Sequence, residues 1–160
     1  MTTTTLELSL PVALSLLSDL VGKKVTGQET DPADLSNEVA MVRGVYLGDG
    51  QPAALFVMDV ALAASLGAAL VLMPAALVKE CVQEKGLLPM LVENSYEVLN
   101  VVSRFINRAG GVHYKLREQT LSGQPLAADA ADILTSASRR VDLALSVDGY
   151  SNGVLSILVK

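Results

Sequence analysis

Four polar residues recur within residues 91–107 at the spacing of a single helix face. They are, in order, Glu93, Glu97, Asn100 and Arg104. At about 100° per residue these positions form one stripe, and the ordinary interpretation of such a stripe is the solvated face of an amphipathic helix. However, like charges at i and i+4 weaken a helix, and Arg104 is too far from Glu97 to pair well. The stripe is therefore not an optimised ladder of salt bridges.

Glu97 and Asn100 could act together on a partner protein. A carboxylate and a carboxamide about one turn apart on a rigid helix can reach into the same shallow site. The carboxylate can bind a cation there, and the carboxamide has both donor and acceptor groups, so it can hold a water molecule without changing its own protonation state. Such a pair suits hydrolysis of an acyl phosphate that is already bound to metal in its own protein, because positioning of the attacking water is the main assistance still missing.

The elements that would position this helix follow from apolar periodicity and turn residues. Helices are expected at residues 11–20, 60–73 and 87–108, and strands at residues 39–47, 53–58, 112–119, 141–147 and 154–159. Loops or connections are expected at residues 26–38, 79–85 and 122–132. This order predicts an α+β fold with a largely antiparallel sheet packed against long helices. The last strand has no charge before Lys160 and is expected to be an exposed edge, suited to pairing across a two-fold axis.

Composition limits the class of protein. The chain has 160 residues, of which 51% are hydrophobic and 18% are charged, so it is expected to be one folded domain rather than disordered. Its net charge of -5 has the wrong sign for unaided binding to a phosphate backbone, so nucleic acid is not an expected partner. Cys81 and His113 are the only residues of their types. A buried thiol and a non-catalytic imidazole are the favoured interpretations, and no metal site is expected.

Residues 60–78 are the one candidate for a membrane span. This uncharged run approaches the roughly 20 residues that a spanning helix needs. Pro74 near its end, its alanine-rich composition and the strand expected just before it favour a buried core helix instead. The N-terminal residues show no basic segment and no cleavage site of a secretory signal. A cytoplasmic protein is therefore expected, with a membrane-associated protein as an alternative.

The segment Glu97-Val98-Leu99-Asn100, with Glu93 four residues before it, resembles the ExxN signature of the CheC/CheX/FliY family of phosphatases, which act on the phosphorylated chemotaxis response regulator. The order of elements over almost the whole chain is also similar, from an N-terminal helix through a glycine-containing hairpin and an alanine-rich helix to a terminal pair of strands. One ExxN helix per chain is closer to CheX than to CheC. The resemblance implies a single CheX-like domain, residues 1–160, that hydrolyses the aspartyl phosphate of a response-regulator receiver domain.

The resemblance also implies roles for individual residues. In the family the glutamate pairs with a lysine of the receiver and the asparagine orients the hydrolytic water, which assigns these roles to Glu97 and Asn100. Glu93 and Arg104 lie on the same stripe and are expected to contact the partner. The family implies no cofactor of the chain's own, because Mg²⁺ is expected in the partner receiver domain. It also implies a homodimer, since CheX is dimeric.

Three positions depart from the family pattern and keep a second function open. Glu93 stands where the family usually has Asp or Ser, and Ser103-Arg104 stands where Gly-Asn often follows the asparagine. The proline expected downstream has only the late candidate Pro125. The alternative is a non-catalytic CheX-like module that binds a receiver or another signalling protein. Arg104 would then either contact the acidic pocket of the partner or obstruct it.

Overall fold

The computed structural model describes residues 9–36, 40–107 and 113–160. The helices are α1 (Leu10–Val21), α2 (Val60–Leu70), α3 (Ala75–Glu84), α4 (Pro89–Asn107), α5 (Ala128–Ala131) and α6 (Ile133–Ser136). The strands are β1 (Val25–Glu29), β2 (Met41–Gly48), β3 (Gln51–Asp59), β4 (Tyr114–Thr120), β5 (Arg139–Val147) and β6 (Asn152–Val159). The predicted α+β class is confirmed.

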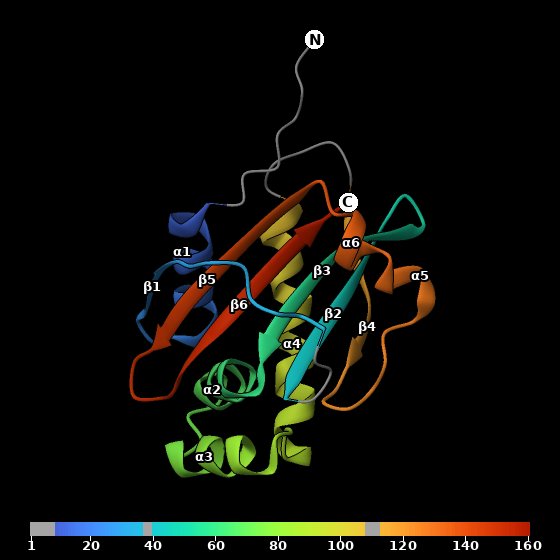
Figure 1. Cartoon of the computed structure of the whole chain (residues 1–160). Helices are drawn as coiled ribbons and strands as arrows, with labels where there is room; N and C mark the ends of the chain where they lie inside the picture. Colours follow the sequence, from blue (N-terminus) through green and yellow to red (C-terminus); the bar gives the residue numbers. More distant parts are fainter. Residues whose placement is uncertain (1–8, 37–39, 108–112) are drawn as a thin grey trace.

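The strands form one sheet in the order β1-β5-β6-β3-β2-β4, and every neighbouring pair is antiparallel (Figure 1). β6 therefore lies inside the sheet, between β5 and β3. The expectation that the last strand is an exposed edge is wrong, and it cannot pair across a two-fold axis. Its apolar run with little alternation is instead typical of a strand that is buried on both faces.

Two layers cover the sheet. α1, α2 and α4 pack on one face, whereas α5, α6 and residues 30–36 cover part of the other (Figure 1). β3 shows why both layers form. Phe56 and Met58 belong to the core under the long helices, and Leu55 and Val57 belong to the core under α5 and α6. Successive side chains of a strand point to opposite faces, so an uninterrupted apolar strand needs cover on both sides.

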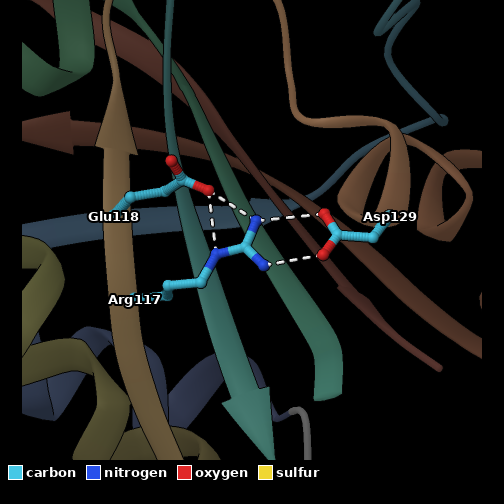
Figure 2. A network of polar contacts seen from close by, with 3 residues as sticks. All are labelled: Arg117, Glu118 and Asp129. Atoms are coloured by element: carbon cyan, nitrogen blue, oxygen red, sulfur yellow. Dashed lines mark hydrogen bonds and ion pairs between the residues drawn. The ribbon is translucent and has the colours of Figure 1, made fainter. Parts of the chain in front are cut away.

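A bulge in β4 ties α5 to the sheet edge. The register with β2 shifts at this point, so that Arg117 has no single Cα partner there. The Arg117 guanidinium donates to both carboxylate oxygens of Asp129, at 2.9 and 3.2 Å, and through Nε to Glu118 at 2.9 Å (Figure 2). The hydrogen bonds from Arg117 lower the pKa of Asp129. Two-point binding by a planar guanidinium fixes orientation as well as distance, so this contact orients the short helix α5.

Asp142 on β5 fastens residues 30–36 to the same face. It is only 4% exposed, and it accepts hydrogen bonds from Ser156 Oγ at 2.5 Å and from the Ala33 backbone N–H at 3.1 Å. The Arg140 guanidinium donates to Asp142 at 2.9 Å and to the Ala33 carbonyl at 2.6 Å. Burial raises the pKa of Asp142, but the hydrogen bonds from Arg140 and Ser156 outweigh burial and lower it. A buried charge is thus fully hydrogen-bonded, as its desolvation requires.

The expected charged connection at residues 79–85 is wrong, because α3 runs through nearly all of it. Pro74 occupies the N-cap position of α3, and Val78 and Cys81 are buried. Two buried residues three positions apart are enough to pack one face of a short helix against the core, while its charged residues face solvent. The loop expected at residues 122–132 likewise contains α5.

The expected loop at residues 26–38 is wrong for its first part, because residues 26–29 belong to β1. Val25 is the one buried residue of this strand. β1 is held by its backbone pairing with β5 along the edge of the sheet, so its sequence shows no apolar alternation. The last part of the expected loop, residues 37–38, and Val39 of the following strand lie outside the described residues.

The apolar run at residues 60–78 is divided between two helices. α2 ends at Leu70 and α3 begins at Ala75, and Leu72 between them has a φ angle of 57°. α2 packs against β6, α3 and α4, which explains why its residues are apolar on nearly all sides. Throughout the described ranges, no helix is long and apolar enough to cross a membrane.

Candidate functional site

α4 carries the predicted site and has one buried face. Its buried apolar residues in the helix-side core are Leu91, Val98, Leu99 and Val102. Through this face the helix packs against α1, α2 and β4. The amphipathic pattern predicted for residues 91–107 is therefore confirmed where side chains are described. Helical spacing also predicts a core-facing side for Phe105 and Ile106, whose side chains lie outside those described.

Hydrogen bonds from side chains to backbone carbonyls fix α4 against its neighbours. They run from Tyr46 to Leu99, from Asn94 to Gly67 and from Gln119 to Val92. The Asn94 and Gln119 bonds measure 3.2 and 3.3 Å. α2 and α4 approach closely at Gly67, where an added Cβ would lie 3.3 Å from Asn94 Cβ. Because β2, β4 and α2 all contribute, the rotation of α4 about its axis is set from several sides.

Sequence reasoning did not identify these positioning residues. Tyr46 and Gln119 come from strands that are far from α4 in the chain, and only the paired register brings them beside it. The one sequence signal that could have pointed to such a role is the position of Tyr46 between Val45 and Leu47 in an expected strand. A tyrosine buried there needs a hydrogen-bond partner for its hydroxyl.

The four residues of the predicted stripe, Glu93, Glu97, Asn100 and Arg104, are all exposed. Helix geometry sets Glu97 and Asn100 about 4.5 Å apart along the axis and about 60° apart around it. Arg104 follows Asn100 by about 6 Å and about 40°. Both members of the central pair can therefore reach one group of a partner. The structure brings the four residues together on one solvent-facing side of α4, and their individual roles stay predictions.

The stripe has no charge compensation of its own. In the described part of the chain, no ion pair includes Glu93, Glu97 or Arg104. The backbone carbonyl of Asn100 accepts a hydrogen bond from Ser103 Oγ at 2.7 Å, but no hydrogen bond among the described residues engages its carboxamide. The carboxylates repel each other, and both they and the carboxamide stay available to a partner.

A shallow groove of about 610 Å³ lies along β1, β5 and β6. The side chains of Thr26 and Ser146 point away from the helix layer, because their neighbours Val25 and Leu145 belong to its core. The groove therefore lies on the opposite side of the sheet from α4. None of its lining residues is an acid, a base or a cysteine, so it does not have the side chains of an acid–base site.

The other residues weighed from the sequence have ordinary surroundings. Cys81 is buried, as expected, and its sulfur accepts a hydrogen bond from the Leu88 backbone N–H at 3.4 Å. His113 is exposed just before β4. Over the described ranges, no group of three or more His, Cys, Asp and Glu side chains could hold a metal ion. The stripe on α4 is thus the best candidate site.

Comparison with known proteins adds evidence on the fold. No family model and no curated protein matches the chain. Solved structures do match: the FliM middle domain from H. pylori has a TM-score of 0.62 at 13% identity, covering 91% of this chain and 82% of that chain. A chain of the CheX-CheY-BeF3-Mg²⁺ complex from Borrelia burgdorferi has a TM-score of 0.56 at 16% identity, covering 94% of each chain. The chain has the CheX/FliM-type fold.

FliY from Thermotoga maritima shares the CheX/FliM-type fold as well, with a TM-score of 0.53 at 12% identity, covering 92% of this chain and 82% of that chain. The resemblance to the CheC/CheX/FliY family is thus confirmed for the fold. The closer likeness to CheX is not resolved, because CheX, FliY and FliM middle domains all match at this level.

Proposed function

We propose that this chain binds a phosphorylated response-regulator receiver domain through α4 and promotes hydrolysis of its aspartyl phosphate. The observation that carries the proposal is the pair Glu97 and Asn100, both exposed on one side of a helix whose rotation is fixed by Tyr46, Asn94 and Gln119. The CheX/FliM-type fold supports it, since one structure with this fold is CheX in complex with CheY, BeF3 and Mg²⁺. The proposed location is the cytoplasm.

The chemistry needs little from this chain beyond positioning. The Glu97 carboxylate accepts hydrogen bonds from a lysine of the receiver and so docks α4 over the acyl phosphate. The Asn100 carboxamide accepts a hydrogen bond from a water molecule and aligns its oxygen with phosphorus. The water oxygen bonds to phosphorus as the bond from phosphorus to the aspartyl oxygen breaks, which yields inorganic phosphate and a free carboxylate. The proton lost by water passes to the phosphate or to solvent, and Mg²⁺ held by the receiver neutralises the developing charge.

The direct test is phosphate release from phosphorylated receiver domains with and without this chain. Asn100→Ala is expected to lower turnover about 100-fold, because the water loses its orientation, while receiver binding is largely retained. Glu97→Lys is expected to impair binding itself by reversing a charge. Both side chains are exposed, so unfolding temperatures should match that of the wild type. Unchanged dephosphorylation by the Asn100 variant would refute the mechanism.

A second candidate function is a non-catalytic module that binds a receiver or another signalling protein. Arg104 favours it, because this exposed, bulky cation lies one turn beyond Asn100 on the same side of α4 and can block close approach of a phosphoryl group. The fold also occurs in FliM, whose solved complexes include one with FliG and one with SpeE. This candidate predicts measurable binding with phosphate release at background. Arg104→Gly would then restore turnover if obstruction alone is the cause.

A further inference from the structure

The exposed side of α4 carries its charges in an order that is complementary to itself. Glu93 and Glu97 lie towards one end of the stripe and Arg104 lies at the other, with Asn100 between them. From Glu93, the next three residues of the stripe follow at about 6, 10.5 and 16.5 Å along the helix axis, and all four fall within about 60° around it. No ion pair in the described part of the chain includes any of the three charges, so each is available to an opposite charge from outside.

One antiparallel register of two such helices pairs every charge. When Arg104 of a second copy lies midway between Glu93 and Glu97, it is about 3 Å from each along the axis, and two-fold symmetry repeats the contact in the other copy. The closest like charges, the two Glu97 side chains, are then about 7.5 Å apart along the axis, so the attractions are the shorter contacts. A parallel pair would set each charge opposite its own copy, which opposes association.

The same register gives partners to two uncharged side chains. The two-fold axis passes within about 1 Å of the level of Asn100, so the carboxamides of the two copies meet, and each has a donor and an acceptor for the other. Tyr96, which is 42% exposed, lies level with Ser103 of the second copy and on the same side of the pair. Ser103 is small, so the ring has room to pack there. Tyrosine is enriched in protein interfaces for such contacts.

We propose that α4 pairs in this antiparallel register with the α4 of a second copy, and that the pairing covers Glu97 and Asn100. The pairing stands on the charges of the stripe, whereas its consequence for activity rests on the function proposed above. A second copy and a receiver would use the same residues and so exclude each other. Contact along one helix face is small, and interfaces below about 1,200 Å² are typical of transient complexes. The chain is therefore free to act when dilute and blocks its own site when concentrated.

Self-association is measured by sedimentation velocity over a series of chain concentrations at low ionic strength, with no receiver present. Arg104→Glu makes the stripe wholly acidic, and the double variant Glu93→Arg/Glu97→Arg makes it wholly basic. Each is expected to raise the Kd of self-association about tenfold or more. An equimolar mixture of the two variants should form a heterodimer, because every charge then faces an opposite one. Tyr96→Ala should weaken the pairing of the otherwise unchanged chain, and Tyr96→Phe should not.

α3 supplies matched controls. Lys79→Glu changes the net charge as Arg104→Glu does, and Glu80→Arg/Glu84→Arg reverses two exposed carboxylates that are also four positions apart. These variants should self-associate as the wild type does. The inference is overturned by a wild type that stays monomeric throughout the series, by an equal loss in the α3 variants, or by a mixture that associates no more than its components. A dimer that Arg104→Glu leaves intact would assign self-association to another face.

The consequence for activity has its own measurement. At a fixed low concentration of phosphorylated receiver, the initial rate of phosphate release per chain should fall as the chain concentration passes the Kd of self-association, and Arg104→Glu should remove this fall. A rate per chain that stays constant while the wild type pairs would overturn the mutual exclusion. If no receiver is dephosphorylated at any chain concentration, the proposed hydrolysis is refuted, whereas the sedimentation results still decide whether α4 pairs.

Discussion

Tyr46→Phe removes a single buried hydroxyl that holds the site helix. Tyr46 is 0% exposed, its ring packs edge-on against Phe56 with centroids 5.3 Å apart, and its hydroxyl donates to the Leu99 carbonyl of α4. Phenylalanine keeps the ring contacts and removes only the hydrogen bond. The Leu99 carbonyl lies within a helix and keeps its backbone partner, so the expected loss is about 1 kcal/mol in the free energy of unfolding. For a chain of this size that loss lowers Tm by about 2–4 °C.

The same substitution has a pH dependence of definite sign. Burial, and to a smaller extent Tyr96, raises the pKa of Tyr46 well above its ordinary value of 10.0. The folded state therefore favours the neutral phenol. This stabilising contribution is fully present below pH 10 and is lost as the pH rises towards the folded pKa, at about 1.4 kcal/mol per pH unit. The Tyr46→Phe variant has no phenol to ionise, so it does not lose stability in this way. The difference in free energy of unfolding between variant and wild type should therefore disappear within about one pH unit above pH 10.

Urea unfolding at pH 7 and across the alkaline range measures both effects. Tyr150→Phe is the matched control, because the Tyr150 hydroxyl also donates to a backbone carbonyl, that of Met73 at 2.7 Å, but away from α4. Both variants should lose stability at pH 7, and only Tyr46→Phe should also slow dephosphorylation of a receiver. A neutral-pH stability equal to wild type, or a deficit that persists unchanged in alkali, would show that the Tyr46 hydroxyl does not hold α4 in a desolvated hydrogen bond.

Two further substitutions test the elements around the site. Asp142→Asn should lower the free energy of unfolding by about 1–3 kcal/mol at pH 7. Because the folded pKa of Asp142 lies below its ordinary 3.8, the stabilisation by the carboxylate is present above about pH 4 and is lost as the pH falls through the folded pKa. The acid-unfolding curves of variant and wild type should therefore converge. Gly153→Ala would place a Cβ 2.4 Å from Asp59 Oδ1 and 2.8 Å from the Leu62 backbone nitrogen. It should lower the free energy of unfolding by about 1–3 kcal/mol, measured as a shift of the urea midpoint to lower concentration. Gly86→Ala, whose added Cβ meets only Ser122 at 3.7 Å, is its control and should stay near wild type.

The parts of the molecule that could be predicted from sequence depend on nearby residues. The exposed side of α4 follows from a period of 3.6 residues, which needs no knowledge of what the helix packs against. The β2–β3 hairpin follows from the Asp49-Gly50 turn, where positive φ angles of 53° and 78° match the residue types. An aspartate directly before an apolar helical run predicts an N-cap, and the Asp59 carboxylate accepts a hydrogen bond from the Leu62 backbone N–H at 2.8 Å.

The parts that could not be predicted depend on partners far away in the chain. β6 has an apolar sequence that an edge or an inner strand could carry, and its place is decided by the pairing of β3 with one side of it and β5 with the other. β1 carries almost no apolar signal, because Val25 is its one buried residue and backbone pairing with β5 holds the rest of the strand. Arg117 reaches Asp129 only because a bulge changes the register of β4. No local pattern encodes these contacts.

The α4 site separates the groups that hold the helix from the groups that face outward. Tyr46, Asn94 and Gln119 hold the helix through backbone carbonyls, so they act on its position without occupying its exposed side. Glu97 and Asn100 are exposed and engage no other side chain among those described, so they contribute little to folding, and the repulsion between the stripe's two carboxylates opposes it. Side chains with no internal partner among the described residues, displayed on a helix fixed from three sides, support the proposed docking of a second protein. A receiver lysine beside Glu97 would reduce this repulsion, so binding would recover the free energy that the repulsion costs in the unbound folded chain.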